Sequence, residues 1–436
     1  MYTFSSKLKT LSLALMIIGL LGVGYGFLSA PASVDEVKVL LQESHNSHGE
    51  VAATDGHATA ETGDVVQSED AHAEHVYHLL KNKPWSALYV ALFFFFMISL
   101  GTLAFYAIQH VSQAGWSIVL FRVMEGITAY LPVGGVLLFV FFVLSATQNH
   151  LFTWMDPEVV ANDMLIQNKA GYLNVPFFLI RAAIYILGWV LYRNYARKLT
   201  IAQDASTDLS NYRKLFKSSA AFLVFFLVTE SMMSWDWIMS LDPHWYSTLF
   251  GWYVFSSLIV SAITTIALIS IYLKGKGYLE FVNNSHLHDL AKFMFGFSIF
   301  WAYLWFSQFM LIWYANIPEE VTYFVTRFND YKVPFLGMVV LNFVFPLLIL
   351  MNSDFKRVPW FIVTAGIIVL IGHYIDIFVM IMPATVGDQW FIGISEISSV
   401  LLVLGIFIYV VFNAMTKAPL LAKGSPFIKE SEHFHY

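Results

Sequence analysis

The stretch NNSHLHDLAKFMFGFSIFWAYLWFSQFMLIWYANIPEE runs from Asn283 to Glu320 and decides the class of fold. After His286, His288 and Asp289 it continues with more than twenty residues that are mostly apolar and rich in aromatic side chains. An apolar helix of this length crosses about 30 Å of hydrocarbon. The stretch therefore predicts a membrane span with ionisable groups at its start.

The composition of the whole chain agrees with a membrane protein. The 436 residues are 58% hydrophobic and only 12% charged, about half the charged fraction that is usual in soluble domains. The formal net charge of −6 is too small to indicate a nucleic-acid partner. Because the chain has no cysteine, it cannot form disulfides, thiolate zinc sites, cysteine-ligated iron–sulfur clusters or covalent c-type haem.

Ten windows are long and apolar enough to span a bilayer, which predicts an all-α polytopic membrane protein. They lie near residues 8–29, 86–108, 119–146, 173–192, 219–240, 250–273, 290–314, 334–352, 358–382 and 393–414.

The distribution of Lys and Arg predicts that both termini lie inside the cell. With an inside N-terminus, sixteen of the 24 basic residues fall on the inner side and six on the outer side, while Arg122 and Arg181 lie at or within spans. The first window also resembles a signal peptide, but its long apolar run and the Pro31 that follows Ala30 favour a retained helix.

Residues 31–84 form the one long polar segment outside the spans. It carries six of the 14 histidines, and His72, His75 and His78 recur at a spacing of three. Three histidines in this pattern can bind a metal. Since nothing in the sequence fixes their geometry, we expect a solvated and partly disordered outer loop without a metal.

The first half of the chain places five ionisable residues in or beside its spans. Arg122 and Glu125 are three apart and share one helix face. Arg181 and Glu230 lie at similar depths, about 12 and 15 Å from the outer surface at 1.5 Å per residue, which predicts an ion pair. Asp236 lies nearer the outside. Two readings stay open: steps of a proton path, or structural ion pairs.

The second half has a polar stripe along the seventh span. At 100° per residue, six small or polar residues fall within about 60° of each other. The stripe suggests that His288 and Asp289 open a path rather than merely end a helix, where a first-turn carboxylate is common anyway. Its members are Asp289, Lys292, Gly296, Tyr303, Ser307 and Tyr314.

The ninth span carries His373 and Asp376, three residues apart and deep in the membrane. Asp376 can orient His373 or exchange a proton with it. A bis-histidine haem is not favoured, because no second histidine lies at a similar depth. Gly22, Gly24 and Gly26 in the first span indicate close helix packing.

Two stretches carry a resemblance to a known family. The stretch from Asn283 to Glu320 and the sequence ESMMSWDWIMSLDPHWYSTLFGWYVF, at residues 230–255, resemble the NrfD/PsrC-like membrane subunits of alternative complex III. This is a bacterial quinol:cytochrome c (or high-potential acceptor) oxidoreductase. The resemblance covers the chain from the second to the tenth span, and the polar segment after the first span is more similar to ActF than to its partner ActC.

The resemblance implies two four-helix bundles, spans 2–5 and 6–9, with spans 1 and 10 at the periphery. The corresponding segments are 1–30 for the first helix, 31–84 for the periplasmic loop, 85–249 and 250–392 for the bundles, and 393–436 for the last helix and a cytoplasmic tail. It also implies a place in the bacterial inner membrane, beside an ActC-like paralogue, a multihaem cytochrome c, an iron–sulfur subunit, other complex subunits and a terminal oxidase.

The expected function is therefore that of a membrane subunit without its own redox cofactor. It would support assembly and a transmembrane proton path, with quinone or menaquinol contact and bound lipids left open. The residues assigned to the path are Glu125, Arg181, Glu230, Asp236, His288, Asp289, Tyr303, Ser307, His373 and Asp376.

Two other classes of protein remain as alternatives. A secondary transporter would show broken helices in both halves, and the sequence offers one good candidate for a break, Pro132-Val133-Gly134-Gly135. A pure scaffold would use the buried charges as structural ion pairs only.

Overall fold

A computed structural model of the chain describes residues 2–48 and 62–435. Within them the chain is helical without strands, and ten helical segments are long and apolar enough to cross a membrane. The predicted all-α polytopic class is confirmed. The segments are α1 (Ser6–Leu28), α3 (Thr62–Val111), α4 (Phe121–Ile127) with α5 (Tyr130–Gln148), α8 (Val175–Asp204), α9 (Ser210–Trp237), α10 (Phe250–Gly275), α11 (Asn284–Ala315), α13 (Lys332–Val339) with α14 (Phe345–Leu350), α15 (Pro359–Val386) and α16 (Ile394–Met415).

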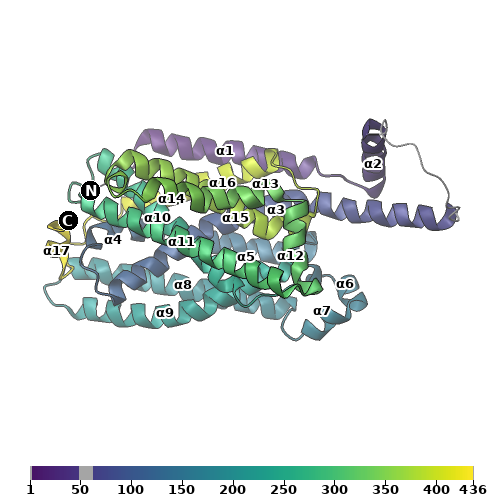
Figure 1. Cartoon of the computed structure of the whole chain (residues 1–436). Helices are drawn as coiled ribbons and strands as arrows, with labels where there is room; N and C mark the ends of the chain where they lie inside the picture. The colour runs from purple at the N-terminus through teal and green to yellow at the C-terminus, as the bar shows by residue number, and fades with distance from the viewer. Residues whose placement is uncertain (1, 49–61, 436) are drawn as a thin grey trace.

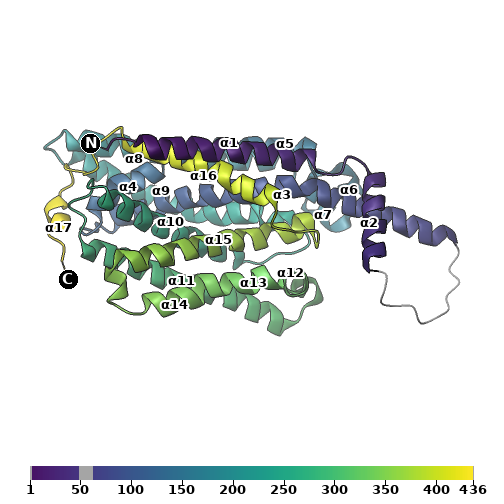
Figure 2. The same ribbon diagram turned by 90° about the horizontal axis from the view of Figure 1, so that it is seen from above.

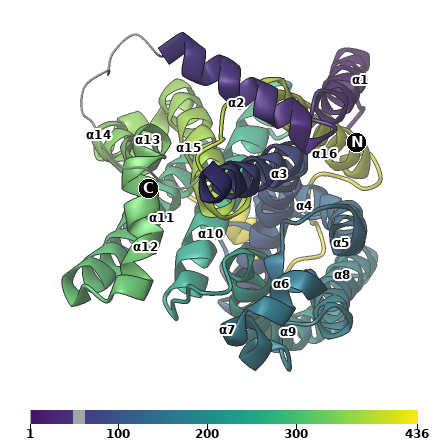
Figure 3. The ribbon, with the colours of Figure 1, turned by 90° about the vertical axis from the view of Figure 1, so that its right-hand side faces the viewer.

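Two helices form the centre of the molecule. The apolar window of α3 is 94% buried and that of α10 is 83% buried, and these two helices pack on each other. On one side, α3 packs with α4, α5 and α9, and α8 joins α5 and α9; we call this group the first bundle (Figure 3). On the other side, α10 packs with α11 and α15, and α13 and α14 lie at the outer edge against α15, with α14 also on α11; this group is the second bundle (Figure 3).

The helices α1 and α16 form a separate pair at the edge of the molecule (Figure 2). A Cβ at Gly19 would lie 2.3 Å from the backbone nitrogen of Leu402, so only glycine permits this approach. Gly22 and Gly26 also face α16 closely, whereas Gly24 has nothing within 4 Å. The predicted glycine packing is confirmed for two of its three residues.

Both ends of the chain lie at the same end of the helices (Figure 1). We call this the terminus end; it also holds the α8–α9 and α10–α11 turns. There the side chain of Asn283 donates a hydrogen bond to the carbonyl of Phe434, 2.6 Å away, beside α17 (Ile428–Glu432). The opposite end carries the short helices α2 (Val34–His48), α6 (Pro157–Asn162), α7 (Met164–Lys169) and α12 (Pro318–Asn329) (Figure 1).

The polar segment 31–84 is more ordered than predicted. Residues 49–61 lie outside the described part, but α2 covers the start of the segment and α3 begins at Thr62. Val37 and Val76 are buried where α2 and α3 pack, and Lys38 forms a 2.6 Å ion pair with Asp70. The described parts of the segment are thus helical where a partly disordered loop is expected, because burial of these apolar side chains holds the two helices together. In the described ranges no three His, Asp or Glu residues gather as metal ligands.

The eighth span contains a π-helical turn. Residues Val340–Val344 separate α13 from α14, and Pro346 follows directly. Proline has no N–H for the carbonyl four residues earlier, and its ring clashes with that carbonyl, so a widened turn relieves the contact with Asn342. The turn leaves the Asn342 side chain buried inside the second bundle.

Candidate functional site

The second bundle encloses a carboxylate at its centre. Asp376 of α15 is fully buried and accepts hydrogen bonds from the Tyr253 hydroxyl of α10 and from the indole N–H of Trp301 of α11, the latter at 2.9 Å. His373 Nδ1 lies 3.5 Å from the same carboxylate. Three helices of this bundle thus meet at one ionisable group.

His373 connects Asp376 to further polar groups. Its Nδ1 lies 2.9 Å from the Ser257 hydroxyl, while its Nε2 has no hydrogen-bond partner in the part of the chain described. The amide of Asn342 is buried and equally without a partner among those residues, and it packs so closely on Gly372 that a Cβ there would lie 2.1 Å from Asn342 Oδ1. Buried polar atoms without partners cost about 1–3 kcal/mol each, so such a concentration suggests function.

Near the terminus end, the first bundle holds a saturated ion cluster. Glu125 accepts from Arg122 at 2.6 Å, from the Thr200 hydroxyl at 2.8 Å and from Tyr106 at 3.0 Å, and it also contacts Arg197. Arg122 and Glu125, which share one helix face as their spacing predicts, form an ion pair. Because several donors already occupy both oxygens of the carboxylate, the geometry favours the structural reading for Glu125.

Arg181 pairs with Asp236 and not with Glu230. The guanidinium binds both carboxylate oxygens, at 2.8 and 3.0 Å, and the Tyr185 hydroxyl adds a third bond at 3.1 Å. The predicted Arg181–Glu230 pair is wrong because similar depths of the two backbone positions do not bring the ends of the two side chains to the same level. A long side chain on a helix leans toward the N-terminus, which for α8 is the opposite end, where Asp236 lies.

Glu230 is consequently a buried carboxyl group without an ion pair. It is 3% exposed, and its Oε1 has no hydrogen-bond partner among the described residues. No basic side chain of residues 2–48 or 62–435 is recorded within 4.0 Å of it. An ionised carboxylate at such a place is costly, which makes Glu230 the stronger proton-path candidate of the first bundle.

The polar stripe of α11 does not line the interior. Tyr303 is 64% exposed and Tyr314 90%, Gly296 is exposed, and Ser307 is only half-buried. Tyr303 therefore faces away from the bundle interior, and the structure offers no support for Tyr303 and Ser307 as residues of a path inside it. In a membrane both the bundle interior and the lipid are apolar, so a periodic stripe identifies a face but not its direction. The buried face instead carries Ser298, Trp301 and Gln308.

The polar residues at the start of α11 have different contacts: His286 caps the helix, while His288 and Asp289 lie buried within it. His286 completes a capping box, since its Nδ1 accepts the Asn283 N–H at 3.1 Å, and its Nε2 lies 3.0 Å from the Ser431 carbonyl oxygen. His286 therefore ends a helix and secures the C-terminal segment. His288 and Asp289 are buried at the terminus end; Nε2 of His288 is 3.3 Å from the Ser353 hydroxyl, and Asp289 contacts Lys292 at 3.1 Å.

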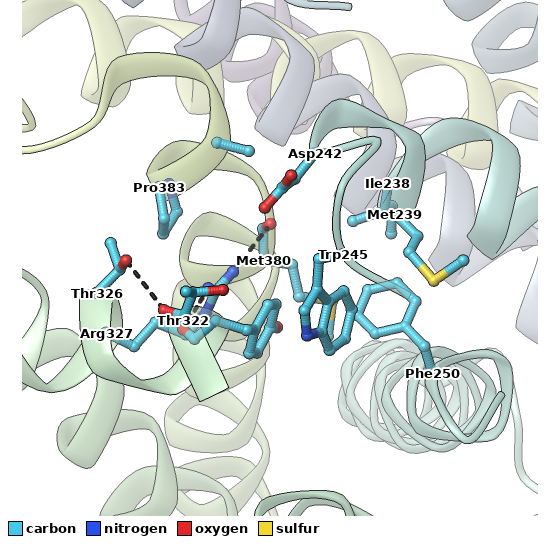
Figure 4. A pocket seen from close by; sticks show the side chains of 12 residues that line it. Ile238, Met239, Asp242, Trp245, Phe250, Thr322, Thr326, Arg327, Met380 and Pro383 are labelled. Carbon is cyan, nitrogen blue, oxygen red and sulfur yellow. Dashed lines mark hydrogen bonds between the residues drawn. The ribbon is translucent and has the colours of Figure 1, made fainter. Parts of the chain in front are cut away.

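Figure 4 shows a small cavity near the opposite end, lined by residues from the end of α9, from α12 and from α15. Its volume is about 80 Å³, and Asp242 and Arg327 are both among its lining residues. Arg327 is buried, with its guanidinium carbon 3.2 Å from the centroid of the Tyr323 ring. Phe250, which also lines the cavity, packs against the ring of Tyr253. The cavity thus ends one aromatic layer away from the Asp376 cluster.

A larger, mostly apolar pocket of about 790 Å³ opens beside the Arg181–Asp236 pair. It lies between the residues that precede α8 and the last turns of α9, and Tyr172 and Trp235 form part of its wall. The guanidinium carbon of Arg181 lies 3.9 Å from the centroid of the Tyr172 ring. Burial, followed by the charge of Asp236, raises the pKa of the Tyr172 hydroxyl to about 12.

Sequence reasoning missed several members of these clusters. Tyr253 and Ser257 are four apart in the sixth span, a spacing that places both on one face, and Asn342 stands four residues before Pro346 in an apolar span. Both spacings can be read directly from the sequence and could have identified these residues. The contacts of Glu125 with Arg197 and Thr200 depend on how α4 and α8 meet, for which the sequence gives no rule.

The fold and these clusters define a class: a multi-pass α-helical membrane protein with buried ionisable groups in both of its bundles. No protein-family model matches the chain. A comparison with curated proteins finds no similar sequence.

Proposed function

We propose that the chain is a membrane subunit of a quinol-oxidising respiratory complex that carries protons across the bilayer through its second bundle. The observation that carries this proposal is the buried pair of His373 and Asp376, whose carboxylate accepts hydrogen bonds from Tyr253 of α10 and Trp301 of α11. Ionisable groups at membrane depth are costly and are typical of proton or substrate pathways.

The chemistry of the pair suits proton transfer. An imidazole can take a proton at one nitrogen and release another from the second nitrogen, and here Nε2 is without a partner among the described residues while Nδ1 faces Asp376 and Ser257. Tyr253 can relay a proton from Asp376 toward the cavity that Asp242 and Arg327 line.

Entry would occur at the terminus end. His288 and Asp289 begin α11 there, and the buried hydroxyl of Ser298 lies farther along the same helix, before Trp301. From Asp289 to Ser298 the helix rises roughly 13 Å at 1.5 Å per residue, so bridging water would have to complete the route.

The resemblance of the sequence to the NrfD/PsrC-like subunits supplies the proposed setting. In that setting the terminus end faces the cytoplasm of a bacterium. Electrons would pass through partner subunits, namely a multihaem cytochrome c and an iron–sulfur protein, with an ActC-like paralogue alongside and a terminal oxidase as a further partner. Since the chain has no cysteine, it offers no thiolate ligand for a redox centre.

Quinol contact is a second candidate function, and the 790 Å³ pocket favours it. The pocket is mostly apolar, as a quinol ring with an isoprenoid tail requires. Tyr172 in its wall is adjacent to Arg181 and Asp236. We expect Trp235→Ala to lower the amount of quinone that copurifies, while Tyr246→Phe, a smaller change on the same wall, leaves it nearly unchanged.

Purification of the tagged chain from its native membranes in mild detergent tests the setting. The proposal predicts that a multihaem cytochrome and an iron–sulfur protein copurify and that the preparation oxidises a quinol analogue. Recovery of the chain alone, with substrate-dependent transport after reconstitution, would instead support the transporter alternative.

A further inference from the structure

A third cavity lies where α1 and α16 meet α3, near the opposite end of the helices. Its volume is about 280 Å³. The end of α1, the turn of α3 around Lys83 and the start of α16 with Glu396 form its walls. None of these residues belongs to the Asp376 cluster, the Glu125 cluster or the Arg181–Asp236 pair.

Glu396 presents a buried carboxylate to this cavity. The side chain is 2% exposed, and its Oε2 accepts the N–H of Gly393 at 2.9 Å, which completes a capping box. Its Oε1 has no hydrogen-bond partner in the described ranges. A buried carboxylate oxygen without a donor in the described chain can accept one from a bound molecule.

Lys83 places a cation in the same cavity without neutralising the carboxylate. Its ammonium lies 4.9 Å from the centroid of the Phe391 ring, and within the described part of the chain it makes no ion pair. One wall thus offers a cation and another an anion. A ligand that matches both must carry one negative and one positive group, the latter with N–H donors.

The surroundings of the cavity are those of a membrane interface. It lies at the ends of two spans, and the aromatic residues Tyr25 and Phe391 line it and remain 55% and 64% exposed. Leu21 and Ile397 are 70% and 53% exposed and offer apolar surface to acyl chains on the same two helices. Aromatic side chains collect at the level of lipid headgroups.

We propose that this cavity binds the headgroup of phosphatidylethanolamine. The primary ammonium of the lipid donates to Glu396 Oε1, and its phosphate pairs with Lys83. Phosphatidylcholine has the same charges, but its trimethylammonium has no N–H to donate. Phosphatidylglycerol has a phosphate but no cation. Comparison of these three headgroups therefore isolates the interaction with Glu396.

Native mass spectrometry of the full chain, or of its complex, with these three lipids at equal acyl composition tests the proposal. A charge-assisted hydrogen bond contributes about 1.5–3 kcal/mol, so wild type should retain phosphatidylethanolamine about tenfold or more over phosphatidylcholine. Glu396→Gln should abolish this preference, because glutamine keeps the capping bond to Gly393 but loses the charge. Lys83→Gln should weaken binding of both lipids alike.

Glu158→Gln, at an exposed position of α6, serves as the matched control and should behave as wild type. A wild-type protein that does not distinguish the two lipids would overturn the proposal, and so would a Glu396→Gln variant that keeps the preference. A melting temperature of Glu396→Gln close to that of wild type shows that the loss is not due to unfolding.

Discussion

At the scale of single residues, the two buried carboxylates of α9 have opposite environments. Asp236 has a bidentate guanidinium and a tyrosine hydroxyl, whereas Glu230 has no ion pair in the described structure. Both would look alike in a hydropathy profile. Their contacts separate a structural charge from a group that is free to exchange a proton.

This difference predicts unequal costs of neutralisation. Asp236→Asn leaves the buried guanidinium of Arg181 without its counter-ion, which should lower the free energy of unfolding by about 3–5 kcal/mol. Glu230→Gln removes no ion pair and should cost less than about 1 kcal/mol. Thermal unfolding in detergent measures both variants, and equal losses would contradict the assignment.

Asp163 gives a prediction about pH at the opposite end. The backbone N–H of Ile166, with a further contribution from His244 at 2.6 Å, lowers the pKa of Asp163 below its ordinary value of 3.8. Because the pKa is lower in the folded protein than in the unfolded chain, its stabilisation is present above that ordinary value. It is lost as pH falls through the lowered pKa.

We therefore expect Asp163→Asn to melt below wild type at neutral pH, with a difference that shrinks only below about pH 4. Asparagine retains the helix cap, so the variant isolates the charge. Melting curves between pH 3 and 7, roughly the window in which a carboxyl titrates, measure the difference. A difference that persists unchanged, or widens, as the pH falls from about 4 to about 3 would contradict the sign.

At the scale of elements, the π turn of the eighth span is held against α15 by a glycine. A Cβ at Gly372 would lie 2.1 Å from Asn342 Oδ1 and 2.8 Å from Leu341 Cβ. Gly372→Ala should therefore destabilise the protein by about 1–3 kcal/mol. Adding Asn342→Ala removes the closer contact and should recover part of the loss. If the double variant shows only the sum of the two single losses, Gly372 and Asn342 are not coupled.

The ten spans and the close packing of the first span at glycine followed from the sequence because apolar length and small-residue spacing are local properties, whereas the partner helix α16 did not follow from it. The shared face of Arg122 and Glu125 followed for the same reason. The partner of Arg181 and the outward face of Tyr303 could not be predicted, since they depend on how neighbouring helices are placed and rotated. The order of segment 62–84 depends on packing against α2, which is equally non-local.

At the scale of the whole molecule, the proton path requires a defined orientation. The chain contains no cysteine, so single cysteines can be introduced without background. Thr207 is exposed in the α8–α9 turn at the terminus end, and Ala161 is exposed on α6 at the opposite end. In spheroplasts, a membrane-impermeant maleimide should label the Ala161→Cys variant without lysis. The Thr207→Cys variant should be labelled only after lysis. The reverse pattern would contradict a cytoplasmic terminus end.

Quinol-driven proton release by the purified complex in liposomes tests the central claim most directly. Asp376→Asn should retain complex yield, while the protons released per quinol fall to those that the quinol itself gives up. Asp388→Asn, at an exposed position beyond the same helix, should leave release unchanged. Unaltered proton release by an intact Asp376→Asn complex would contradict a path through the second bundle.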